Sequence, residues 1–137
     1  MSGVAGEVRI TLLVRFCETD LMGIVHHANY LQYFEVGRVA WLKAHGVDLR
    51  HWGGAQLPVV EALVRYRKPA RFDDELEIAT WLPEIKGASM RFAYAARREG
   101  EVLCEGETKL ACVGAELTPQ RIPTGLRALL EGPVQVV

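Results

Sequence analysis

A single long helical pattern, lying between stretches that alternate like strands, most strongly constrains how this 137-residue chain can fold. From about Tyr30 to His45, apolar residues recur at the 100° spacing of an α-helix and gather on one face. That face carries Tyr30, Tyr33, Phe34, Gly37, Ala40, Trp41 and Ala44. Because the opposite side is largely polar, we expect the helix to be buried along one stripe. Gly37 would let the helix backbone approach its packing partner closely.

Five strand patterns accompany this helix, one before it and four after it. They cover Val8–Phe16, Val59–Lys68, Glu75–Leu82, Ser89–Arg97 and Glu101–Val113. Tight connections such as Arg98-Glu99-Gly100 make the later strands hairpin neighbours, and a short helix is expected over about Thr124–Glu131. We therefore predict an α+β fold in which an antiparallel five-stranded sheet wraps around one long central helix, the architecture called the hotdog fold.

Size and composition narrow the class of protein further. The length fits one domain spanning 1–137, and the net charge of −1 gives no reason to expect nucleic acid as a partner. The sequence lacks an apolar run of the ~18–20 residues that a membrane span needs, and its start does not resemble a signal peptide. The three cysteines form no C-x-x-C pair, so we expect reduced thiols and a cytoplasmic location.

Chemistry-bearing residues cluster between the first strand and the helix, over 16–41, where the sequence reads FCETDLMGIVHHANYLQYFEVGRVAW. Asp20 lies in a short loop that ends where the helix begins, and Gly23 relaxes the backbone of that loop. The polar residues His26, His27 and Asn29 follow. A carboxylate ahead of free helix N–H groups can attack or activate, while the N–H groups stabilise negative charge.

Residues 18–42, ETDLMGIVHHANYLQYFEVGRVAWL, resemble the signature of hotdog-fold acyl-CoA thioesterases. The group includes 4-hydroxybenzoyl-CoA thioesterase and the small thioesterases associated with the Tol–Pal envelope system. The stretches LPVVEALVRYRKPARFDDELEI and LTPQRIP are similar to later parts of the family, so the resemblance covers about residues 8–124. It implies hydrolysis of an acyl- or aroyl-CoA to a carboxylic acid and CoA. It also implies a homo-oligomer, dimer or tetramer, with active sites at a subunit interface.

The same resemblance assigns two catalytic positions. Asp20 matches the family's catalytic carboxylate, and His27 matches the residue whose backbone N–H polarises the thioester carbonyl. Asp20 would act as a nucleophile or as a general base on water, and both remain open. The side chain of His27 would line the pocket or shuttle a proton. An isolated Asp before a helix is more commonly only a cap, which is the competing interpretation of Asp20.

Six residues are candidates for substrate binding: Gly23, Asn29, Val60, Glu61, Lys86 and Ser89. The resemblance places the strand residues Val60 and Glu61 near substrate across the interface, and Lys86 and Ser89 near the CoA phosphates. A solvated strand face explains Glu61 and the basic residues as well or better. Asn29 is expected to pin the loop.

Metal and cofactor chemistry is not expected. The adjacent pair His26 and His27 would point apart in extended chain, and no cluster of His, Cys and Asp completes a metal site, so we predict neither a metal nor a cofactor. We also expect Glu18 to face away from Asp20, which argues against a paired-carboxylate mechanism.

Two other function classes remain. One is a hotdog enoyl-CoA hydratase, whose sequence pattern has a catalytic His five residues after the Asp. Val25 holds that position here, which argues against this class. A non-catalytic acyl-CoA-binding module could dispense with the carboxylate, whereas this chain keeps Asp20.

Overall fold

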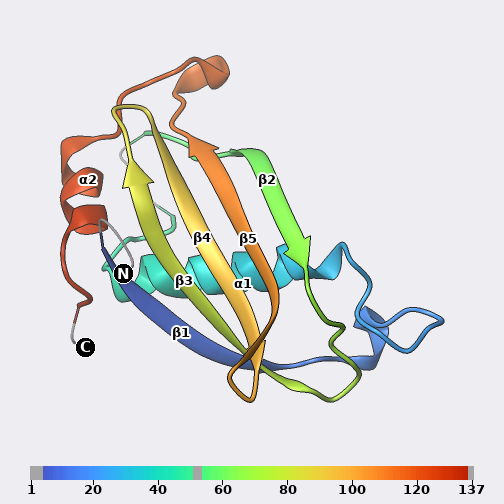
Figure 1. Ribbon diagram of the computed structural model, residues 1–137. Coiled ribbons are helices and arrows are strands. Elements are labelled where there is room, and N and C mark those ends of the chain that lie inside the picture. Colours follow the sequence, from blue (N-terminus) through green and yellow to red (C-terminus); the bar gives the residue numbers. More distant parts are fainter. Residues whose placement is uncertain (1–4, 51–53, 136–137) are drawn as a thin grey trace.

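The structure is a computed structural model that describes residues 5–50 and 54–135 (Figure 1). Its elements in chain order are β1 (Ala5–Leu13), η1 (Phe16–Glu18), α1 (Asn29–Ala44), β2 (Val59–Tyr66), β3 (Glu75–Ile85), β4 (Ser89–Arg98), β5 (Glu101–Ala111), η2 (Ala115–Leu117) and α2 (Thr124–Glu131). The strands form one antiparallel sheet in the order β1-β3-β4-β5-β2. The sheet curves around α1, which confirms the predicted hotdog architecture (Figure 1).

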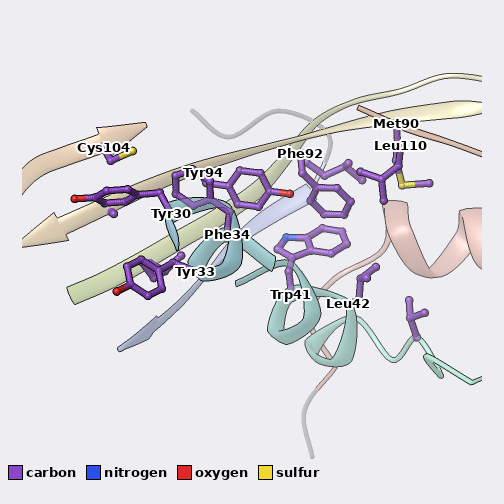
Figure 2. Packing of buried hydrophobic residues seen from close by; sticks show 14 of the residues in the cluster. Tyr30, Tyr33, Phe34, Trp41, Leu42, Met90, Phe92, Tyr94, Cys104 and Leu110 are labelled. Carbon is purple, nitrogen blue, oxygen red and sulfur yellow. The ribbon is translucent and has the colours of Figure 1, made fainter. Parts of the chain in front are cut away.

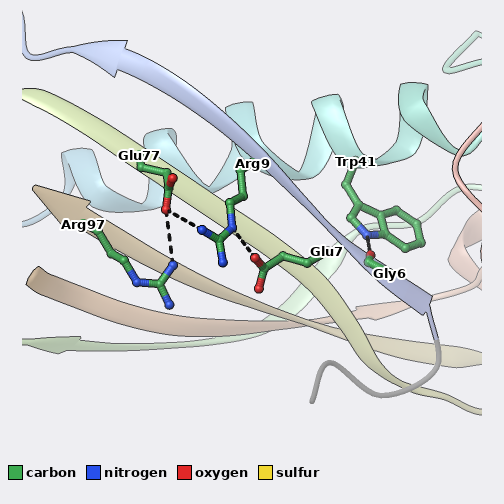
Figure 3. A network of polar contacts seen from close by, with 6 residues as sticks. All are labelled: Gly6, Glu7, Arg9, Trp41, Glu77 and Arg97. Atoms are coloured by element: carbon green, nitrogen blue, oxygen red, sulfur yellow. Dashed lines mark hydrogen bonds and ion pairs between the residues drawn. The ribbon is translucent and has the colours of Figure 1, made fainter. Parts of the chain in front are cut away.

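The apolar stripe of α1 packs on β1, β3 and β4. Phe34 stacks on Tyr94 with ring centroids 4.7 Å apart, and Trp41 meets Phe92 edge to face at 5.1 Å (Figure 2). The indole N–H of Trp41 donates a hydrogen bond of 2.8 Å to the carbonyl oxygen of Gly6 on β1 (Figure 3). These contacts fix both the rotation of α1 and its position along the sheet.

Gly37 sets how closely α1 approaches the sheet. A Cβ at this position would lie 2.5 Å from Thr80 Oγ1 and 2.9 Å from Ile78 Cγ2, both on β3. Gly106 on β5 likewise allows a close approach of α1, since a Cβ there would lie 2.5 Å from the Phe34 ring. A densely packed interior has no room for such overlaps, so both positions require glycine.

The other face of the sheet is charged and internally paired. Glu77 Oε1 lies 3.4 Å from the guanidinium groups of Arg9 and Arg97, and Arg9 also pairs with Glu7 (Figure 3). Partly exposed ion pairs of this kind contribute little stability each. Neither helix in the described part of the chain is long and apolar enough to cross a membrane.

The strand β2 is mostly exposed, with Val64 alone partly buried. Ala62, Val64 and Tyr66 pair with buried residues of β5 and so face the helix side of the sheet. Ala62 and Tyr66 nevertheless remain exposed and Val64 is only partly buried, because α1 packs mainly on β1, β3 and β4. The apolar residues Val59, Val60, Leu63 and Tyr66 are each 44–53% exposed.

Several strand boundaries differ from the predicted ones by one to three residues. The first strand ends at Leu13 instead of Phe16, because the chain turns into η1, and Phe16 is exposed. The third strand continues beyond Leu82 to Ile85. Its register shifts between Trp81 and Glu84, which accommodates Pro83 as an irregularity within the strand.

The close approach at Gly37 predicts that Gly37→Ala destabilises the protein. Alanine would favour the helix by about 1 kcal/mol, but overpacking against β3 costs about 1–3 kcal/mol, so the net effect is a loss. Gly125→Ala in α2 is the matched control, because a Cβ there meets nothing within 4 Å. Thermal unfolding should show a lower Tm for Gly37→Ala and an unchanged or higher Tm for Gly125→Ala. A higher Tm for Gly37→Ala would contradict this packing.

Candidate active site

Asp20 lies in a tight reversal between η1 and α1. Thr19 and Val25 form an isolated antiparallel bridge across the loop. The Asp20 N–H donates to the carbonyl of Ile24 at 2.9 Å, and the Gly23 N–H donates to the carbonyl of Asp20 at 3.0 Å. Gly23 has φ +78°, a conformation that glycine adopts without strain. The loop therefore holds Asp20 by main-chain hydrogen bonds on both sides.

The Asp20 carboxylate has one anchored and one free oxygen. Its Oδ1 accepts a hydrogen bond of 2.8 Å from the Met22 N–H. Among the hydrogen bonds of the described residues, none uses Oδ2. The N-terminal cap of α1 is Ala28, and no side chain caps it, so Asp20 is not the helix cap. The free oxygen is placed to accept a proton or to attack an electrophile.

The turn before α1 leaves one backbone donor unused. The Ala28 N–H donates to His26 Nδ1 at 3.2 Å, and the Asn29 N–H donates to the His26 carbonyl at 2.9 Å. No hydrogen bond in the described part of the chain uses the His27 N–H. This N–H shares a peptide unit with the His26 carbonyl, so the bond from Asn29 both orients and polarises it. It adds to the positive end of the helix dipole.

Asp20 and His27 line the same cavity, which has a volume of about 320 Å³. Its other lining residues are Met22, Ile24, Val25, Tyr30, Tyr66, Arg67, Lys68 and Pro69. A residue with a free carboxylate oxygen and a residue with an unused backbone N–H that line one cavity are candidates to act on the same carbonyl group. Val25 is almost fully buried and apolar, so the position that carries His in the hydratase pattern supplies no acid or base here.

Tyr66 is a residue of this cavity that the sequence analysis did not single out. Its hydroxyl donates a hydrogen bond of 3.0 Å to the carbonyl of His27, and its ring meets the His27 ring edge to face at 6.4 Å. The signal in the sequence was its place on the inward face of β2, but strand periodicity alone does not show that this strand ends beside the loop.

Asp20 also borders a second depression, together with Gly23, Asn29 and the aromatic pair Phe16 and Phe72. The two phenylalanine rings meet edge to face at 5.6 Å. The Asn29 side chain donates a hydrogen bond of 2.8 Å to the carbonyl of Glu18 and so pins the loop to the start of α1. The structure therefore brings Asp20, Gly23, His27 and Asn29 together.

The other candidates lie elsewhere on the same chain. Glu61 is exposed on the charged face of the sheet, 3.7 Å from Arg91, and Val60 lies at the opposite end of β2 from Tyr66. Lys86 and Ser89 belong to the β3–β4 turn. Since β3 starts beside the end of β1, this turn lies at the far end of β3 from the Asp20 loop (Figure 1).

The described residues offer no other obvious reactive centre. They include no group of three or more His, Cys, Asp or Glu side chains placed to hold a metal ion. Burial raises the pKa of the Cys104 thiol to about 12 and also raises the pKa of Cys112, so both thiols stay protonated at neutral pH. Cys17 is exposed beside the second depression.

Comparison with known proteins identifies the family of this chain. Residues 14–130 match the model of the thioesterase-like superfamily. YneP from Bacillus subtilis is 36% identical over 107 residues, which cover 75% of this chain and 77% of that protein. The acyl-CoA thioester hydrolase YbgC from Escherichia coli is 30% identical, covering 84% of this chain and 89% of YbgC. The crystal structure of the hypothetical protein TT1821 from Thermus thermophilus superposes with a TM-score of 0.85 at 37% identity, covering 89% of this chain and 95% of TT1821.

The chain belongs to the thioesterase-like superfamily. The predictions of the family, of the hotdog fold and of a thioester hydrolase are therefore confirmed.

Proposed function

We propose that this chain hydrolyses the thioester bond of an acyl- or aroyl-CoA, with Asp20 and the backbone N–H of His27 as the catalytic groups. The observation that carries the proposal is one cavity lined by both residues, in which a carboxylate oxygen and a helix-start N–H remain unused. No bound cofactor is needed for this reaction, because a thioester carbonyl is electrophilic and a thiolate leaves readily.

The His27 N–H donates to the thioester carbonyl oxygen, on which negative charge develops as the carbon is attacked. Asp20 either removes a proton from a water molecule that adds to the carbon, or attacks the carbon itself and forms a mixed anhydride that water then hydrolyses. In both routes the C–S bond breaks and CoA leaves as a thiolate that takes up a proton. An oxygen from water ends in the carboxylic acid.

Pairing of two copies along β2 completes the proposed site. This edge strand exposes several apolar side chains and has little of α1 packed on it, whereas β1, at the other edge, has α1 against its inner face. An exposed apolar edge is a natural template for pairing with another strand. In a two-fold antiparallel pair, the start of one β2 lies beside the end of the other. Val60 of one copy would then approach the Tyr66 end of its partner, where the cavity lies.

Replacing the free carboxylate tests the reaction directly. Asp20→Asn should lower turnover by about 10²–10⁴-fold, because the amide neither attacks nor accepts a proton efficiently. Asp48→Asn is the matched control, since Asp48 Oδ1 also accepts a local N–H bond, from Arg50 at 2.9 Å, and borders neither cavity. Free-thiol release from short, long and aromatic acyl-CoAs measures both variants.

Wild-type turnover by Asp20→Asn would contradict the mechanism. Hydration of an enoyl-CoA without thiol release would favour the hydratase alternative, and binding of acyl-CoA without any turnover by the wild type would favour the binding module.

The exposed edge predicts the effect of a charge at Val60. Val60→Lys should convert the oligomer to a monomer, because burying an unpaired ammonium costs several kcal/mol. A loss of about 3 kcal/mol raises the dissociation constant more than 100-fold. Leu13→Lys, on the opposite edge strand, is the control and should leave the oligomer intact. Sedimentation velocity measures both. An unchanged oligomer for Val60→Lys would exclude association through β2.

A further inference from the structure

Glu18 is a buried acidic residue that borders neither cavity yet lies two residues before Asp20. Both of its carboxylate oxygens are occupied. Oε1 accepts hydrogen bonds of 2.8 Å from the Tyr33 hydroxyl and from the Arg15 N–H, and Oε2 accepts one of 3.0 Å from Arg15 Nε. Residues 16–18 form a 3-10 turn, which directs this side chain inward to α1 instead of toward the Asp20 carboxylate.

The main chain of Glu18 makes a second set of bonds to the same helix start. Its carbonyl oxygen accepts from the His26 N–H at 2.9 Å and from the Asn29 side chain at 2.8 Å. One residue therefore binds the turn that presents the His27 N–H through its backbone, and binds Tyr33 of α1 through its side chain. Asp20 follows after a single intervening residue.

The electrostatics keep this link charged. Burial by itself would raise the pKa of the Glu18 carboxyl, but the hydrogen bonds from the Arg15 N–H, the Tyr33 hydroxyl and the Arg15 guanidinium outweigh burial and lower the pKa. Burial raises the pKa of the Tyr33 hydroxyl. The hydrogen bond to Glu18 and the negative charge of Glu18 raise this pKa further. Tyr33 thus stays a protonated donor to an ionised carboxylate, and charge-assisted bonds are short and directional.

We propose that Glu18 and Tyr33 form a positioning pair that fixes the Asp20 carboxylate relative to the His27 N–H. This role rests on the proposed thioester hydrolysis. A buried carboxylate is costly to maintain, and an apolar contact would hold a loop equally well against the helix. What the carboxylate adds is a fixed direction and distance between the loop and the helix start, which catalysis by two separate groups requires.

Tyr33→Phe and Glu18→Gln test this role. Tyr33→Phe keeps the ring but deletes the hydroxyl, and Glu18→Gln keeps the size but removes the charge. Tyr94→Phe is the matched control, because it deletes another buried hydroxyl, which bonds Thr108 and accepts from Arg38 away from the site. Tm, kcat and KM are measured for acyl-CoA hydrolysis by the wild type and the three variants.

Both test variants should lower kcat by about tenfold or more while KM stays within about twofold, because displacement of a catalytic group slows the reaction without removing substrate contacts. Tyr94→Phe should lose a similar amount of Tm and keep its kcat. If Glu18→Gln does not fold, Tyr33→Phe decides the matter alone.

Unchanged kcat in Tyr33→Phe, at a Tm loss like that of Tyr94→Phe, would overturn the positioning role and leave the proposed function intact. Absence of turnover by the wild type would overturn the proposed function, and the positioning role with it.

Discussion

The close packing of α1 on the sheet at Gly37 is the contact on which the site depends. A side chain at this position would collide with Thr80 and Ile78, so only glycine lets the helix lie at this depth. With the helix at this depth, Trp41 reaches the Gly6 carbonyl and Phe34 stacks on Tyr94. The helix axis is thereby fixed over β1, β3 and β4, and its first turn is directed at the loop that carries Asp20.

The loop, in turn, is joined to the helix start by hydrogen bonds from one residue. Glu18 binds the His26–Asn29 turn through its carbonyl and Tyr33 through its carboxylate. This arrangement places the two proposed catalytic groups, the His27 N–H and the Asp20 carboxylate, on adjoining segments. In the proposed mechanism, the main chain supplies the oxyanion donor and a single carboxylate supplies the base or nucleophile, which is enough for a thioester because its leaving group is good. The uncovered β2 edge leaves room for a second copy to close the cavity.

Much of the fold could be predicted from the sequence, because its signals are local. The helical stripe around Trp41 and the alternation of the strands follow from periods of 3.6 and 2 residues. The end of the first strand could not be predicted, because the alternation continues to Phe16 although the strand ends at Leu13 and the chain turns into η1. At the site, Asp20 and His27 come from one contiguous motif, so the resemblance could propose both, and the structure places them on one cavity. The place of Tyr66 in the cavity and the proposed role of Glu18 depend on contacts between segments that are distant in the sequence. Neither the hydrophobic periodicity nor the motif shows these contacts. The exposure of β2 depends on where α1 lies, which periodicity also leaves open.

The most direct test of the central claim is a crystal structure with an acyl-CoA analogue in which a methylene group replaces the thioester sulfur. The account predicts that the ketone oxygen accepts a hydrogen bond of about 3 Å from the His27 N–H. The free oxygen of the Asp20 carboxylate should face the carbonyl carbon, directly or through one water molecule. A ketone oxygen bound elsewhere, with the His27 N–H turned to solvent, would contradict the account.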